Sequence, residues 1–300
     1  MVSVIAVFGP TASGKTAVAE AIADRLGTDV VSCDALQVYR GLPILTNQPE
    51  RPTALVAIRE LSEAMAVGAY AALAHDAIDE RVANAGTAIV SGGTGLYLRA
   101  ALADMRVPPP PGTGVRERVM SEVETDPTAA HERLHSLDPR SAASVHVNDA
   151  RRLVRALELA EAGRSLVPDD DRLWGSGTRH PTLIIGIDVP ANELEQRIVA
   201  RTDAMFANGV VQEVRTALET GVSPTAAKAL GLAEIASLSE ADARERIIIR
   251  TRRYAAYQRK WMRRIPGLVS VDGTLSPQAA ADALLGTSGL TTRATSPLPL

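Results

Sequence analysis

The sequence has almost no cysteine, no long apolar run and little net charge, and each absence excludes a class of protein. Cys33 is the only cysteine among 300 residues, so an intramolecular disulfide and a cysteine-based zinc module are both excluded. No apolar stretch approaches the roughly 20 residues that span a bilayer, and the N-terminus lacks a cleavable signal pattern. We therefore expect a cytoplasmic protein without membrane contact, in which Cys33 is a small buried residue at a strand end.

The net charge of −3 argues against a protein that coats nucleic acid indiscriminately, but the cations are unevenly distributed. Many of them lie in residues 244–264, where Glu245 is the single carboxylate. These cations are Arg244, Arg246, Arg250, Arg252, Arg253, Arg259, Lys260, Arg263 and Arg264. This segment predicts RNA contact through some of its arginines. Tyr254, Tyr257 and Trp261 share a helix face there, and such a stripe favours core packing.

A phosphate-binding loop directly follows the first apolar run, residues 4–8. Residues 9–16 read GPTASGKT, the pattern G-x-x-x-x-G-K-[ST], and an amphipathic helix follows. Such a loop turns backbone N–H groups toward an anion, while its lysine and threonine reach the outer phosphate oxygens and Mg²⁺. The expected diphosphate-binding residues are Gly9, Pro10, Thr11, Ala12, Ser13, Gly14, Lys15 and Thr16, with Thr16 as the metal ligand. The chain is therefore predicted to bind a di- or triphosphate.

Strand-like and helical patterns alternate along most of the chain. The predicted strands are residues 4–8, 30–33, 88–91, 183–187 and 268–271. The predicted helices between and after them include residues 15–26, 69–84, 95–103 and 277–285. This alternation indicates an α/β fold, a P-loop NTPase-like parallel sheet flanked by helices, with the phosphate loop at the carboxyl end of the first strand.

The pattern becomes helical throughout between residues 115 and 163, after a proline-rich linker. We expect an inserted all-helical lobe of residues 108–175 that contacts RNA. The catalytic core then comprises residues 1–107 and 176–286, and residues 287–300 form a disordered tail. Three adjacent aspartates at 169–171 lack further ligands at useful spacing, which favours a solvated loop over a metal site.

Two further motifs follow predicted strands and so lie at the same edge of the sheet. Residues 34–41 read DALQVYRG and residues 92–97 read GGTGLY. A carboxylate at Asp34 can hold Mg²⁺ or take a proton from a nucleophile. The glycine turn lets the backbone approach a ligand, and the Thr94 hydroxyl can donate or accept. Turn or cap residues are the simpler alternative for both motifs.

Together the three motifs resemble the tRNA dimethylallyltransferases, also called tRNA isopentenyltransferases. The resemblance covers about residues 3–265 and continues through the motifs at 148–158, 201–213 and 253–261. It implies Mg²⁺-dependent transfer of a dimethylallyl group from dimethylallyl diphosphate to N6 of the adenosine just 3′ of the anticodon. The implied partner is the anticodon stem-loop of tRNA, and we expect a monomer.

The resemblance also implies roles for individual residues. Asp34 and Thr94 are the implied catalytic residues, which deprotonate the adenine amine and hold the reactants in line. Arg201 is an additional diphosphate clamp. The residues implied in tRNA binding are Asp34, Ala35, Leu36, Gln37, Thr94, Arg116, Arg151, Arg152 and Arg155. Ion pairs within the protein are the alternative role for the four arginines of the lobe.

The chain departs from the family's pattern at several positions. Ala35 replaces serine, residues 45–49 read LTNQP in place of GTAKP, Thr53-Ala54 replaces His-His, Leu232 replaces tyrosine, and Tyr257 replaces arginine. These departures concern the acceptor more than the chemistry. Three alternative functions therefore stay open: an isopentenyltransferase that acts on free AMP, ADP or ATP, a P-loop small-molecule kinase, and a non-catalytic RNA-binding relative. The helical lobe and the arginines favour tRNA, because a free nucleotide needs neither.

Overall fold

A five-stranded, wholly parallel sheet in the order β2-β3-β1-β4-β5 organises the larger part of the chain. The strands are β1 (Val4–Phe8), β2 (Val30–Ser32), β3 (Ala88–Gly92), β4 (Thr182–Asp188) and β5 (Val269–Asp272). Side chains of the central strand β1 alternate between two cores: Phe8 packs in one and Val7 in the other. All five predicted strands are confirmed, within one residue at either end.

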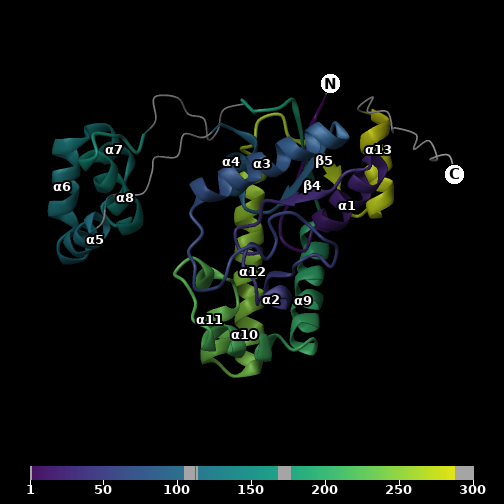
Figure 1. Ribbon diagram of the computed structural model, residues 1–300. Helices are drawn as coiled ribbons and strands as arrows, with labels where there is room; N and C mark the ends of the chain where they lie inside the picture. Colours follow the sequence, from purple (N-terminus) through teal and green to yellow (C-terminus); the bar gives the residue numbers. More distant parts are fainter. Residues whose placement is uncertain (1, 105–111, 113, 168–176, 288–300) are drawn as a thin grey trace. The chain divides into compact units, whose positions relative to one another are not determined.

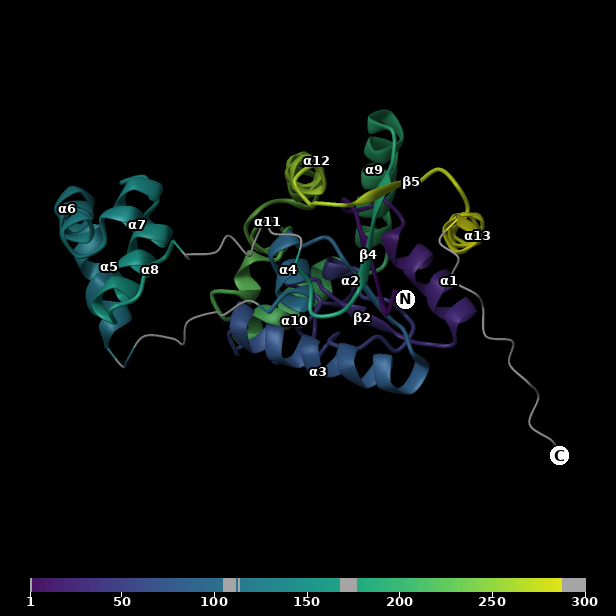
Figure 2. The same ribbon diagram turned by 90° about the horizontal axis from the view of Figure 1, so that it is seen from above.

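Helices cover both faces of this sheet (Figure 2). On one face α1 (Lys15–Leu26) packs with α13 (Pro277–Thr287), and on the other lie α3 (Val67–Ala85) and α4 (Gly95–Leu102). The other helices of this unit are α2 (Pro43–Thr46), α9 (Ala191–Ala207), α10 (Val210–Glu219), the 3-10 helix η1 (Ala226–Lys228), α11 (Leu232–Ser237) and α12 (Glu240–Met262). The predicted parallel α/β sheet flanked by helices is therefore confirmed.

This computed structural model describes residues 2–104, 112, 114–167 and 177–287 (Figure 1). The chain divides into two compact units, Met1–Met105 with Leu173–Leu300, and Arg106–Arg172. Most of the proline-rich linker, the aspartates at 169–171 and residues 288–300 of the predicted tail lie outside the described residues. No helix in the described ranges is long and apolar enough to cross a membrane.

The smaller unit is helical, and its described residues contain no strand. Its helices are α5 (Val115–Thr125), α6 (Pro127–Leu137), α7 (Pro139–Ser144) and α8 (Ala150–Glu161). Aspartates cap three of them: Asp126 begins α6, Asp138 begins α7 and Asp149 begins α8. Leu153 and Leu157, one turn apart on α8, are fully buried in a separate apolar core.

Helix α12 docks on the glycine turn that follows β3. A Cβ atom built on Gly95 would lie 2.2 Å from the Trp261 ring, and one on Gly93 would lie 2.2 Å from the side-chain amide of Gln258. Both distances are far below van der Waals contact, so only glycine allows this approach. Most side chains that α12 buries recur every three or four residues, namely Ala243, Ile247, Thr251, Ala255, Gln258 and Met262, and Ile248 is buried beside them. The glycine turn was expected to let a ligand approach the backbone, and in the structure α12 makes this close approach.

We expect Gly95→Ala to lower the free energy of unfolding by about 1–3 kcal/mol, because the added methyl group forces the rigid Trp261 ring away from α4. Urea denaturation of the purified protein measures this change. Gly177→Ala is the matched control: Gly177 is exposed, and among the described residues its added Cβ has no neighbour within 4 Å, so a change within about 0.5 kcal/mol is expected. An unchanged Gly95→Ala would contradict the close docking of α12.

Candidate functional site

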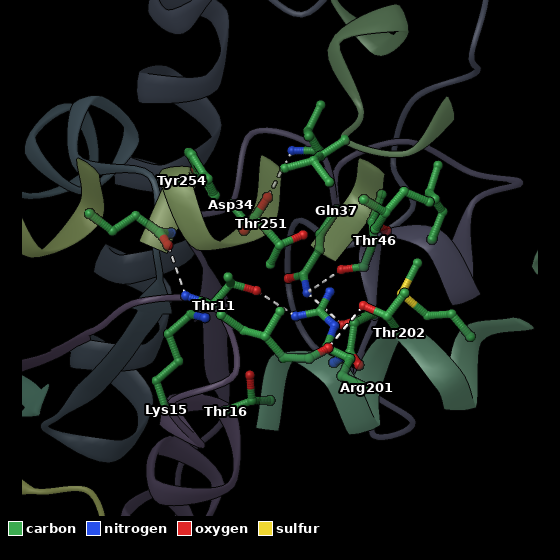
Figure 3. A pocket seen from close by; sticks show the side chains of 18 residues that line it. Thr11, Lys15, Thr16, Asp34, Gln37, Thr46, Arg201, Thr202, Thr251 and Tyr254 are labelled. Atoms are coloured by element: carbon green, nitrogen blue, oxygen red, sulfur yellow. Dashed lines mark hydrogen bonds between the residues drawn. The ribbon is translucent and has the colours of Figure 1, made fainter. Parts of the chain in front are cut away.

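The three sequence motifs meet at the carboxyl edge of the sheet, because β1, β2 and β3 are parallel neighbours in space. There the first two motifs line one pocket together with α9 and α12 (Figure 3), whereas the third motif, residues 92–97, contributes no side chain to its described lining. Its lining comprises Thr11, Lys15, Thr16, Asp34, Leu36, Gln37, Leu45, Thr46, Asn47, Ile198, Arg201, Thr202, Met205, Leu230, Ile247, Thr251, Tyr254 and Gln258. Residues from both ends of the chain thus form one site.

The phosphate loop has the conformation that its sequence predicts. Ala12 and Gly14 adopt left-handed φ values of 64° and 84°, and α1 begins directly after Gly14 with no side-chain cap on its N–H groups. These N–H groups are therefore available to an anion. Ser13 is buried, and a Cβ atom built on Gly9 would lie 2.7 Å from the Ser13 hydroxyl oxygen. Ser13 therefore shapes the loop with its side chain.

Two cations and one carboxylate lie together in the pocket. Arg201 on α9 donates from Nη1 to the Thr11 hydroxyl at 2.6 Å, which fixes it beside the phosphate loop. Burial lowers the pKa of Lys15 and that of Arg201, while the negative charge of Asp34 opposes both shifts. Each cation also lacks its full shell of water, so an anionic ligand here gains strong electrostatic stabilisation.

The loop that carries Asp34 is held by its own hydrogen bonds. Asp34 Oδ1 accepts from the Leu36 N–H at 2.9 Å. The Gln37 side chain accepts from the Ser32 hydroxyl at 3.0 Å and donates to the Asn47 carbonyl at 2.8 Å. Both ends of the Gln37 amide are thus engaged within the protein. To read a base edge, as the resemblance implies, Gln37 would exchange one of these bonds.

Thr94 reaches the pocket through Tyr254. Its hydroxyl accepts from the Ala35 N–H at 3.3 Å and is hydrogen-bonded to Tyr254, which lines the pocket. Burial, and then the charge of Asp34, raise the pKa of Tyr254 to about 12. The Tyr254 hydroxyl therefore stays protonated at neutral pH and can donate a hydrogen bond.

Gln258 connects the phosphate loop to the glycine turn. Its Oε1 accepts from the Thr11 N–H at 2.8 Å, and its Nε2 donates to the Gly93 carbonyl at 2.8 Å. The side chain is buried, with an exposed fraction of 2%. One amide on α12 therefore fixes the distance between two loops that follow different strands.

Apart from Arg201, the side chains that α9 and α12 contribute to the pocket were not predicted. Ile198, Thr202 and Met205 surround Arg201 on one face of α9, at spacings of three and four residues. That periodicity around Arg201 was the available signal, since residues at such spacing share a helix face. The sequence did not indicate which face of α12 borders the pocket.

The prediction that Tyr254, Tyr257 and Trp261 all pack in the core is wrong for two of the rings. Trp261 does pack against the apolar core. Tyr254 lines the pocket, and Tyr257 is 54% exposed. Helix α12 buries only a narrow stripe, so a residue about 100° away from that stripe faces solvent. Cys33, in contrast, is fully buried after β2, as predicted.

The lobe contains a buried carboxylate that collects two of the predicted RNA-binding arginines. Glu158 lies 3.0 Å from Arg155 Nη1 and 3.6 Å from Arg116 Nη1, and its side chain is 1% exposed. Arg151 and Arg152, at the start of α8, are exposed. The intramolecular alternative therefore describes Arg155, which is hydrogen-bonded to Glu158, and Arg116, which lies within ion-pair distance of it.

Known protein families match this chain over nearly its whole length. The sequence model of the family described as IPP transferase matches residues 37–265, and that of the family described as isopentenyl transferase matches residues 2–60. The tRNA dimethylallyltransferase of Anaeromyxobacter dehalogenans is 39% identical over 290 residues, covering 92% of this chain and 97% of that protein. The tRNA dimethylallyltransferase of Streptomyces coelicolor is 39% identical over 280 residues, covering 88% of each chain.

Solved structures share the fold over nearly the whole chain. The full-length tRNA isopentenylpyrophosphate transferase of Bacillus halodurans superimposes with a TM-score of 0.68 at 26% identity, covering 95% of this chain and 96% of that one. A eukaryotic dimethylallyltransferase acting on tRNA has the same fold, with a TM-score of 0.81 at 24% identity, covering 98% of this chain and 82% of that one. The chain therefore belongs to the tRNA dimethylallyltransferase family.

Proposed function

We propose that this chain transfers a dimethylallyl group from dimethylallyl diphosphate to N6 of the adenosine next to the tRNA anticodon. The observation that carries the proposal is one pocket in which Lys15, Thr16 and Arg201 lie with the carboxylate of Asp34 (Figure 3). A phosphate-binding set beside a carboxylate suits a reaction in which diphosphate leaves and an amine loses a proton. The names of its relatives support tRNA as the acceptor.

The phosphate side of the pocket would stabilise the leaving group. As the allylic C–O bond breaks, negative charge grows on the diphosphate oxygens, which Lys15, Arg201 and the N–H groups of the phosphate loop would bind. Apolar side chains of the same pocket would contact the five-carbon group, namely Leu45, Ile198, Met205, Leu230 and Ile247. The donor is thereby held at both ends.

The carboxylate side would act on the acceptor. The lone pair of N6 forms the new C–N bond to C1 of the donor, and the electron pair of the C–O bond leaves with the diphosphate. The proton lost from N6 goes to the carboxylate of Asp34. Tyr254, which is hydrogen-bonded to Thr94, is placed to orient the amine.

Mg²⁺ would neutralise part of the diphosphate charge when bound. The oxygen donors of this pocket include the Thr16 hydroxyl and the Asp34 carboxylate, and among the described residues no group of three or more His, Cys, Asp or Glu forms a protein cage for a metal. This fits Mg²⁺, which keeps waters and substrate phosphates among its ligands. Thr16 is the residue that we propose as its protein ligand.

The lobe of residues 108–175 is proposed to bind the anticodon stem. Arg151 and Arg152 are exposed at the start of α8, where they can contact phosphates. Arg155 is hydrogen-bonded to the buried Glu158, and Arg116 lies within ion-pair distance of it, so Arg155 would lose less conformational entropy on binding. Their remaining donors would contact RNA without rearrangement of the lobe.

We expect the purified protein, with Mg²⁺ and dimethylallyl diphosphate, to add the mass of one prenyl group to unmodified tRNA and none to AMP. Nuclease digestion and mass spectrometry locate the group. Lys15→Ala should lower kcat/KM about 10²–10³-fold, because the leaving group is then less stabilised. Lys228→Ala, at an exposed lysine outside the pocket lining, is the control. Product on AMP alone, or ATP consumption without prenyl transfer, would overturn the proposal.

Asp34→Asn tests the proton acceptor separately. The amide oxygen can still accept from the Leu36 N–H, so the loop is retained while basicity is lost. We expect kcat to fall about 10²–10⁴-fold, with the Kd for dimethylallyl diphosphate changed by less than about threefold. Single-turnover kinetics and calorimetry measure the two quantities. Asp76→Asn, at an exposed position of α3, is the control, and an unchanged kcat in Asp34→Asn would remove Asp34 from this role.

Replacing both Arg151 and Arg152 with alanine should weaken tRNA binding and reduce the slope of log Kd against log salt by about one for each phosphate that the protein no longer touches. Filter binding at several salt concentrations measures the slope. Arg118→Ala is the matched control, since Arg118 lies in the same lobe and is paired with Glu161. An unchanged slope in the double variant would show that these arginines do not touch phosphates.

A further inference from the structure

One exposed row of side chains runs along α12 and continues just past its C-terminal end. Its members recur at intervals of three or four residues, which places those within α12 on one face of the helix. They are Arg246, Arg250, Arg253, Tyr257 and Lys260 on α12 and Arg264 after it, and every one is exposed. A single aromatic ring therefore stands in the middle of a row of cations.

The cations of this segment are not equally engaged. Arg244, Arg252 and Arg259 lie off the row and pair with Asp203, Glu195 and Asp188. Within the row, Arg250 pairs with Glu234. Arg253 and Lys260 flank Tyr257 by four and three residues, and in the described part of the chain no carboxylate lies within ion-pair distance of either. The two cations closest to the ring therefore retain their capacity for an external anion.

The exposed ring is continuous with the pocket. Tyr257 stacks on Tyr254, with ring centroids 6.5 Å apart and planes inclined by 22°. Tyr254 lines the pocket and is hydrogen-bonded to Thr94. Two rings thus lead from the site of the proposed chemistry to the surface, and the outer ring keeps 54% of its area exposed.

We propose that Tyr257 is a stacking platform for a base that neighbours the reacting adenosine, with Arg253 and Lys260 bound to the adjoining phosphates. The inference rests on the proposed function. A target base that enters the pocket must leave the base stack, which uncovers one face of its neighbour. An aromatic ring between cations is the surface that binds such a face, since stacking and phosphate contact reinforce one another.

Tyr257 offers a neutral ring, and the flanking Arg253 and Lys260 supply the charge. Contact with the neighbouring base would therefore rest on stacking, and contact with its phosphates on the two cations. A purely structural role for Tyr257 would instead require a buried ring, and the ring is exposed.

The test uses the full chain and an anticodon stem-loop RNA, with the prenyl assay as readout. We expect Tyr257→Ala to raise the KM for this RNA roughly 5- to 100-fold, with kcat within about threefold of wild type. Tyr257→Phe keeps the ring and should stay within about twofold. When an abasic nucleotide replaces first one and then the other neighbour of the target, wild type and Tyr257→Ala should have the same KM on one of the two RNAs.

Each result supports or overturns the platform. A wild-type KM for Tyr257→Ala on the intact RNA overturns it, as does an equal rise in KM on the intact and both abasic RNAs, which would indicate structural damage. In either case prenylation of RNA by the wild-type protein leaves the proposed function standing. If the wild-type protein prenylates no RNA, the proposed function itself fails and the platform fails with it.

Discussion

The docking of α12 on two loops is the interaction on which the rest of the site depends. The buried amide of Gln258 accepts from Thr11 in the phosphate loop and donates to Gly93 in the glycine turn. Each such hydrogen bond contributes about 0.5–1.5 kcal/mol net. The larger effect of the Gln258 amide is geometric, because its two hydrogen bonds fix the spacing between two loops that could otherwise move independently. Trp261 reinforces the same contact where it packs over Gly95.

Burial of charge gives this pocket electrostatics that suit a polyanion. Lys15 and Arg201 are both desolvated, and one carboxylate, Asp34, offsets part of that cost. A group of two cations and one anion in a low-dielectric pocket keeps an excess positive charge that a diphosphate can neutralise. The lobe shows the opposite balance, in which Glu158 draws two arginines into a local cluster within the protein.

Much of the fold could be predicted because it depends on local pattern. Apolar runs such as residues 4–8 predicted the bounds of each strand to within one residue. The spacing of glycine, lysine and threonine in residues 9–16 correctly predicted the phosphate loop. The motif at 34–41 also reached the expected edge of the sheet. Patterns of this kind succeed because burial on a pleated or helical surface has a fixed period.

The sequence by itself determined the parallel α/β fold, the helical lobe and the family, because each depends on periodicity or on residues adjacent in the chain. Tertiary structure alone decided that the turn at 92–95 receives a helix, that Tyr254 lines the pocket and that Tyr257 faces solvent. These outcomes depend on which face of α12 meets β3 and the phosphate loop. That choice follows from contacts between residues about 165 or 247 positions apart, and no local pattern contains it.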